Sequence, residues 1–133
     1  GSLAERALTG LLDDAVFDQK EVLILKYGYA WEKLYIGLRC LAGTGTSKER
    51  LIKAWRSGIH KLADHLFDAK LSAELMAIHD ALTAKIDQES GKGSVAATVA
   101  QMTEDEACSW SLRIVDLAVD VIRLSALESS GSA

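Results

Sequence analysis

Apolar residues recur along this chain at the three- and four-residue spacing that is typical of amphipathic α-helices. Three places show a capping-box pattern, in which a short polar side chain is followed three positions later by Glu: Asp18 with Glu21, Thr46 with Glu49, and Thr103 with Glu106. Each pattern precedes about twenty residues without a strong helix breaker. The spacing therefore predicts long helices over 19–42, 47–67 and 104–127.

Weaker apolar patterns predict two further helices, over 3–16 and 70–88. The stretch Ser94–Met102 fits either a helical turn or an extended segment. Short polar or glycine-bearing joints separate the helices, and joints of this length make neighbouring helices antiparallel. We predict an all-α fold, a single-domain antiparallel bundle of four to five helices over 3–127, with a frayed tail over 128–133 and Gly1-Ser2 as the scar of a cleaved tag.

Composition narrows the class of protein. The 133 residues include no proline, which argues against proline-rich linkers and turn-dense β-sandwiches. The formal net charge of -4 argues against a general nucleic-acid binder, because such proteins need positive charge to bind phosphates. No apolar run approaches the roughly 20 residues of a membrane span. Cys40 and Cys108 are the two cysteines, and they lie far apart in the sequence. This is more typical of reduced thiols in the cytoplasm than of a secreted protein held by disulfides, so we expect a cytoplasmic protein.

The predicted helix 19–42 carries two apolar stripes rather than one. Leu23, Tyr27, Ala30, Trp31, Leu34, Leu38 and Leu41 form the principal stripe. A second stripe consists of Val22, Leu25, Tyr29, Ile36 and Cys40. A helix that is apolar on two sides lies either in the middle of its own bundle or between its domain and a partner. Both interpretations remain open at this point.

The last predicted helix repeats this pattern, because apolar and small side chains cover well over half of its circumference. If the second stripes form an interface, its residues on this helix are Val115, Val119, Ile122 and Ala126. Twofold dimers are the commonest assemblies of a single chain, so a homodimer is the expected partner, with another protein as the alternative.

The predicted helix 47–67 offers the best candidate for chemistry. Arg56, His60 and Asp64 are four residues apart and would stack along one line of a continuous helix. An imidazole beside a carboxylate, with a guanidinium one turn away and Lys53 as a positive neighbour, suits acid–base chemistry on a phosphate ester. The competing interpretation is a solvated face with a weak ladder of salt bridges.

The segment Arg56-Ser57-Gly58-Ile59-His60 loosely resembles the Arg and His motif of HEPN-type ribonucleases. The spacing here is shorter, and the motif falls in a central rather than a late helix. The resemblance implies RNA as a phosphate-bearing substrate, and only as an alternative.

Metal chemistry finds no support in the residue spacing. There is no Glu-x-x-His for a di-iron bundle, no Glu-x-x-Glu for a magnesium-dependent pyrophosphohydrolase resembling MazG, and no close Cys and His pair for zinc. We therefore expect no metal and no cofactor.

The three tryptophans, Trp31, Trp55 and Trp110, fall on the core stripes of three separate helices. This placement predicts one shared aromatic cluster, which could also line a small-molecule pocket. Taken together, the patterns favour a self-associating interaction or regulatory module, and the alternative is a small enzyme that uses Arg56 and His60.

Overall fold

The computed structural model describes residues 19–66, 68–91 and 93–131, and it confirms an all-α fold. Five α-helices pack together, with no strand among these residues. The helices are α2 (Gln19–Leu41), α3 (Ser47–Arg56), α4 (Ala69–Leu82), α5 (Val95–Ala100) and α6 (Glu104–Gly131). Helix 3–16 of the prediction and Asp18 lie outside the described residues.

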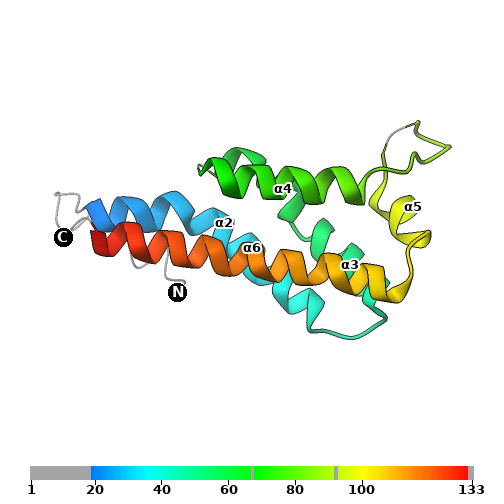
Figure 1. Ribbon diagram of the computed structural model, residues 1–133, viewed down its shortest axis with the longest axis horizontal. Coiled ribbons are helices and arrows are strands. Elements are labelled where there is room, and N and C mark those ends of the chain that lie inside the picture. Colours follow the sequence, from blue (N-terminus) through cyan, green and yellow to red (C-terminus); the bar gives the residue numbers. More distant parts are fainter. Residues whose placement is uncertain (1–18, 67, 92, 132–133) are drawn as a thin grey trace.

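The two long helices form the axis of the molecule. α2 and α6 run antiparallel along each other, α4 lies alongside α6, and α3 and α5 pack at the end where α6 begins (Figure 1). Their shared core is aliphatic and includes Leu34, Leu51, Ile78, Ile114 and Leu117, all fully buried. No described helix is both long and apolar enough to cross a bilayer.

The capping box predicted at Thr103 is confirmed, and at Thr46 the N-cap half of the predicted box is confirmed. Thr46 Oγ1 accepts a hydrogen bond from the Glu49 backbone N–H at 3.2 Å. At α6, Thr103 Oγ1 accepts from the Glu106 N–H at 3.0 Å, and the Glu106 carboxylate accepts from the Thr103 N–H at 3.3 Å. These bonds satisfy backbone donors that a helix start leaves unpaired, and only those of α6 are reciprocal.

The prediction of one helix over 47–67 is wrong. α3 ends at Arg56 because Gly58 adopts a φ of +141°, which no helix contains. Two 3₁₀ turns follow, Ile59–Lys61 and Ala63–His65. Pattern alone could not show this, because a single glycine is tolerated inside many helices.

Two other helix ends also differ from the prediction. α4 stops at Leu82 instead of 88, where the Thr83 hydroxyl donates to the His79 carbonyl oxygen at 2.7 Å. α6 continues to Gly131, so the residues expected to begin the frayed tail are helical up to that point. The undecided stretch after Ser94 is the short helix α5, with the Ser94 side chain as its N-cap.

One ion pair ties α4 to α6. Arg113 donates from Nε and Nη2 to the two carboxylate oxygens of Glu74, each at 2.9 Å. Both side chains remain more than one third exposed, so the pair contributes about 0.2–1 kcal/mol and mainly fixes orientation.

Candidate functional site

The second stripe of α2 is partly covered by the chain itself. The Tyr29 ring lies 4.2 Å from the His65 ring, centroid to centroid, with the Lys33 ammonium 5.5 Å from its centre. Cys40 packs against the core, whereas Ile36 is exposed. The side chains of Val22 and Leu25 lie outside the described residues. Of the five residues predicted for an interface on this helix, Ile36 is the clearest surface residue.

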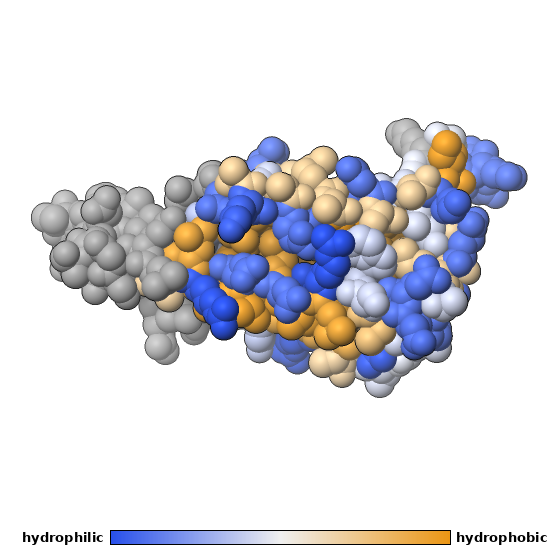
Figure 2. Space-filling view, viewed as in Figure 1, coloured by the Kyte–Doolittle hydropathy of each residue, from blue (hydrophilic) through white to orange (hydrophobic). Residues whose placement is uncertain are grey.

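The second stripe of α6 is more open. Leu112 is 59% exposed, Val119 38% and Ile122 42%, while Val115 is half-buried and Ala126 is exposed. The opposite side of the same helix, represented by Ile114, Leu117 and Val121, is fully buried. In the view of Figure 2, apolar side chains reach the surface beside the polar ones along the α2 and α6 pair.

Sequence reasoning missed two members of this α6 stripe. Cys108 and Leu112 extend it by two positions, and both are exposed. The complete stripe, which we call the α6 seam, consists of Cys108, Leu112, Val115, Val119, Ile122 and Ala126. Its spacing alternates four and three residues without a fault, which is the heptad pattern of a two-stranded coiled coil. Testing the sequence for a period of 3.5 residues would have found the seam.

The two flanks of the α6 seam differ in character. One flank carries Asp116 and Arg123, seven residues apart and both exposed. Neither forms a salt bridge with another described residue. The other flank has only small side chains at the same interval, Ser111, Ala118 and Ser125. One flank can therefore pair charges with a partner, whereas the other carries no charge, and Ala118 on it is already buried in the core.

The predicted catalytic residues do not share one helix line. Arg56 is the last residue of α3, His60 lies in the first 3₁₀ turn, and Asp64 lies in the second. The expectation that they stack at one-turn intervals is wrong, because the helix that would align them ends before Ser57. Lys53 is exposed on the last turn of α3.

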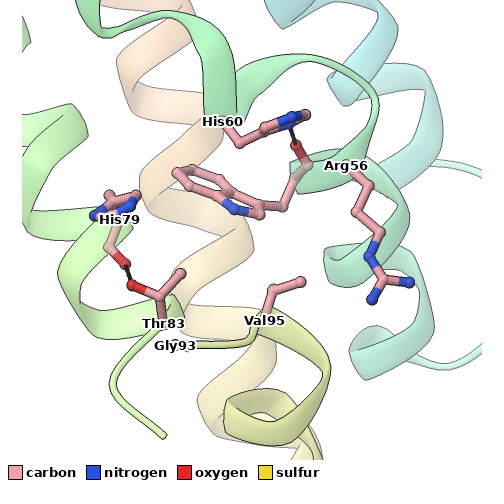
Figure 3. A pocket seen from close by; sticks show the side chains of 7 residues that line it. Arg56, His60, His79, Thr83, Gly93 and Val95 are labelled. Atoms are coloured by element: carbon pink, nitrogen blue, oxygen red, sulfur yellow. Dashed lines mark hydrogen bonds between the residues drawn. The ribbon is translucent and has the colours of Figure 1, made fainter. Parts of the chain in front are cut away.

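A pocket nevertheless brings Arg56 and His60 together. It has a volume of about 280 Å³ and lies between the ends of α3 and α4 and the start of α5 (Figure 3). Its walls are formed by Trp55, Arg56, His60, His79, Thr83, Gly93 and Val95. Asp64 is not among them. His79, Thr83 and Gly93 come from elements that sequence reasoning could not place beside α3.

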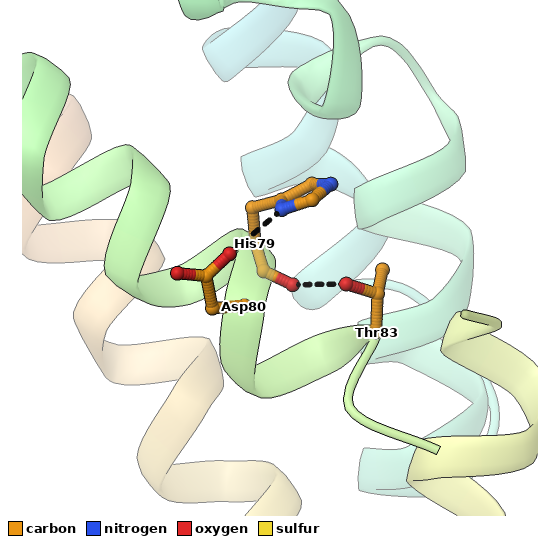
Figure 4. A network of polar contacts seen from close by, with 3 residues as sticks. All are labelled: His79, Asp80 and Thr83. Atoms are coloured by element: carbon orange, nitrogen blue, oxygen red, sulfur yellow. Dashed lines mark hydrogen bonds and ion pairs between the residues drawn. The ribbon is translucent and has the colours of Figure 1, made fainter. Parts of the chain in front are cut away.

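Polar contacts hold both imidazoles of this pocket in place. His60 donates from Nδ1 to the Trp55 carbonyl oxygen at 3.0 Å. His79 donates from Nδ1 to the Asp80 carboxylate at 3.2 Å, and its own carbonyl oxygen accepts from Thr83 (Figure 4). Among the described residues, no three His, Cys, Asp or Glu side chains gather as a metal ion would require.

The three tryptophans do not form the predicted shared cluster. Trp31 contacts the Tyr35 ring, Trp55 contacts the His79 ring, and Trp110 lies under the Arg113 guanidinium. No ring contact joins any two of the tryptophans among the described residues. Of the three tryptophans, Trp55 is the one among the described lining residues of the pocket.

Comparison of the chain with protein-family models, with curated proteins and with solved structures finds no match.

Proposed function

We propose that this protein is a self-associating interaction module in which the α6 seams of two copies pair across a twofold axis. The observation that carries the proposal is the seam itself, six apolar or small positions in unbroken heptad spacing on the open side of a 28-residue helix. An apolar stripe of this kind loses contact with water when two helices pack knobs into holes.

Charge favours an antiparallel arrangement of the two α6 helices. A twofold axis crossing α6 near residue 119 brings Asp116 of one copy opposite Arg123 of the other, and the symmetry forms the same pair twice. In a parallel pair, the residues facing this flank would be the small ones, and no charges would meet. The antiparallel dimer therefore uses both exposed charges.

The α2 stripe remains a second way to make a homodimer. Ile36 is its most open described member, so replacing it by Glu tests this surface separately. We expect Ile36→Glu to leave the α6-mediated dimer intact. If Ile36→Glu were a monomer, the interface would lie on α2 instead of α6.

The direct test of the α6 seam is Val119→Glu, which places a charge in the middle of the stripe. Because Val119 is exposed in the single chain, the variant should still fold, while the solution mass should fall to that of a monomer. Met76→Glu is the matched control, since Met76 is an exposed apolar residue on α4 and lies outside the seam. A dimer that survives Val119→Glu would refute the proposal.

A second candidate function is a small enzyme acting on a phosphate-bearing substrate. The specific observation in its favour is that Arg56 and His60 line one pocket, although they do not share a helix. Asp64 has no place in this version, because it lies outside the pocket wall. The free thiols of Cys40 and Cys108 support our proposal that the protein works in the cytoplasm.

A further inference from the structure

The pocket wall contains a buried hydrogen-bond donor that finds no acceptor among the described residues. Trp55 is only 4% exposed, and its indole N–H donates to no described residue. Trp55 lines the pocket together with Thr83 and Val95 (Figure 3 shows the lining residues). A buried donor without an acceptor costs free energy, so the pocket is built to receive an acceptor at this point.

The two imidazoles offer acceptors in return. Each ring commits its Nδ1–H to an acceptor within the chain, the Trp55 carbonyl oxygen for His60 and the Asp80 carboxylate for His79. In the neutral tautomer this leaves Nε2 as an acceptor, and in the protonated form Nε2 becomes a second donor. Both side chains line the pocket, so each can either accept or donate a hydrogen bond to a ligand.

Arg56 adds a permanent positive charge to the same wall. The described pocket wall therefore carries the Arg56 guanidinium, the Trp55 indole N–H, and two imidazole Nε2 atoms that can each accept or donate a hydrogen bond. No carboxylate is among the described lining residues, and the Asp80 carboxylate accepts the hydrogen bond from His79. This combination favours an anion over a neutral or cationic ligand.

We propose that the pocket binds a small phosphate monoester, with the Trp55 indole N–H donating to a phosphate oxygen and the Arg56 guanidinium balancing its charge. A phosphate monoester has a second pKa of about 6, so it can present an acidic P–OH or a bare oxygen to each imidazole. A carboxylate lacks this proton near neutrality and matches the two Nε2 atoms less well.

The size of the pocket limits the ester. At about 280 Å³ it lies just below the range of typical ligand pockets, roughly 300–1,000 Å³. The Val95 side chain and the face of the indole supply an apolar wall for a short carbon chain. The site therefore fits a phosphorylated small metabolite and not a nucleic-acid strand. This inference stands independently of self-association, since no pocket residue belongs to the α6 seam.

The experiment follows the three indole N–H signals by proton–nitrogen correlation NMR while glycerol 1-phosphate is added at constant ionic strength. Trp31→Phe and Trp110→Phe identify two of the signals without touching the pocket, so the third belongs to Trp55. We expect a saturable downfield shift of the Trp55 signal, as a new hydrogen bond produces. The Trp31 and Trp110 signals should stay in place.

Matched variants assign the shift to the pocket. Arg56→Gln and His60→Asn should each weaken binding at least about tenfold, whereas Arg39→Gln and His65→Asn, which change the same residue types outside the pocket, should leave it unchanged. Sulfate, which carries no proton near neutrality, should bind at least about tenfold more weakly than the monoester.

Three results would overturn the inference. An unmoved Trp55 signal would mean that the pocket holds only water. An equal response to sulfate would show that the imidazoles share no proton with the ligand. Unchanged binding in Arg56→Gln would place the ester elsewhere. Loss of the dimer in Val119→Glu, by contrast, tests only the seam.

Discussion

Two glycines of α2, Gly28 and Gly37, differ in the space that surrounds them. A Cβ added at Gly28 meets no atom within 4 Å, whereas a Cβ at Gly37 comes within 2.5 Å of Ile59 Cδ1. Ile59 is fully buried, so it has no room to move aside. Gly37 is therefore the residue that lets the first 3₁₀ turn pack directly on α2.

This difference predicts opposite effects of the same substitution. Gly28→Ala should stabilise the fold by about 0.5–1 kcal/mol, because alanine loses less backbone entropy in a helix. Gly37→Ala gains the same propensity but overfills the contact with Ile59, and we expect a net loss of about 1–3 kcal/mol. Urea unfolding of both variants measures the two free energies. Equal stabilisation by both would show that Ile59 is not packed against Gly37.

At residue scale the sequence pattern was a better guide to burial than to backbone. Ile59, Leu62 and Leu66 follow the three- and four-residue spacing of the helix predicted over 47–67, and all three are buried. They reach the core from 3₁₀ turns and the residues that follow them, because a repeat of three to four residues suits either geometry. The positive φ of Gly58 leaves no trace in the hydropathy pattern.

At the scale of elements, caps define where helices begin more clearly than apolar periodicity defines where they end. The capping boxes located the starts of α3 and α6 within one residue, because the bonds that form them are local. The end of α4 depends instead on Thr83 and on the loop that returns to α5. Lys85 N–H in that loop donates to Thr98 Oγ1 at 2.9 Å, a contact thirteen residues along the chain.

The capping box of α6 gives a direct prediction. Thr103→Ala removes the acceptor of the Glu106 N–H and should lower the free energy of unfolding by about 0.5–2 kcal/mol. Thr44→Ala is the control, since Thr44 is exposed in the turn between α2 and α3. The midpoint of chemical unfolding compares the two. A loss no larger than that of the control would mean that the box adds nothing to α6.

The candidate pocket joins residues that lie far apart in the sequence. Arg56 and His60 could be selected because they lie close together in the chain. His79, Thr83 and Gly93 join them only because α4 and the approach to α5 fold over Trp55. Gly93 approaches so closely that a Cβ there would clash with the Thr83 carbonyl oxygen. Such a tertiary contact has no local sequence signature.

At the scale of the whole molecule, the α6 seam is proposed as an interface in which charges determine the antiparallel orientation of the two helices. Asp116→Arg would place like charges opposite each other twice in the antiparallel dimer, so we expect the dissociation constant to rise roughly tenfold or more. Combining Asp116→Arg with Arg123→Asp exchanges the two charges and should restore most of the affinity. Sedimentation equilibrium measures all three proteins.

Asp120→Arg serves as the control for this charge exchange, because Asp120 is exposed on α6 but lies off the seam and its flanks. It changes the net charge by the same amount and should leave the dimer nearly unaffected. A double exchange that fails to recover affinity would rule out the antiparallel pairing of Asp116 with Arg123.

The most direct test of self-association is the solution mass of the unaltered chain, measured by light scattering over a concentration series. The account predicts a mass that rises with concentration towards about 29 kDa, twice the 14.4 kDa of one chain. A mass that stays at 14.4 kDa over the whole series would contradict it, and the open stripe of α6 would then be ordinary surface.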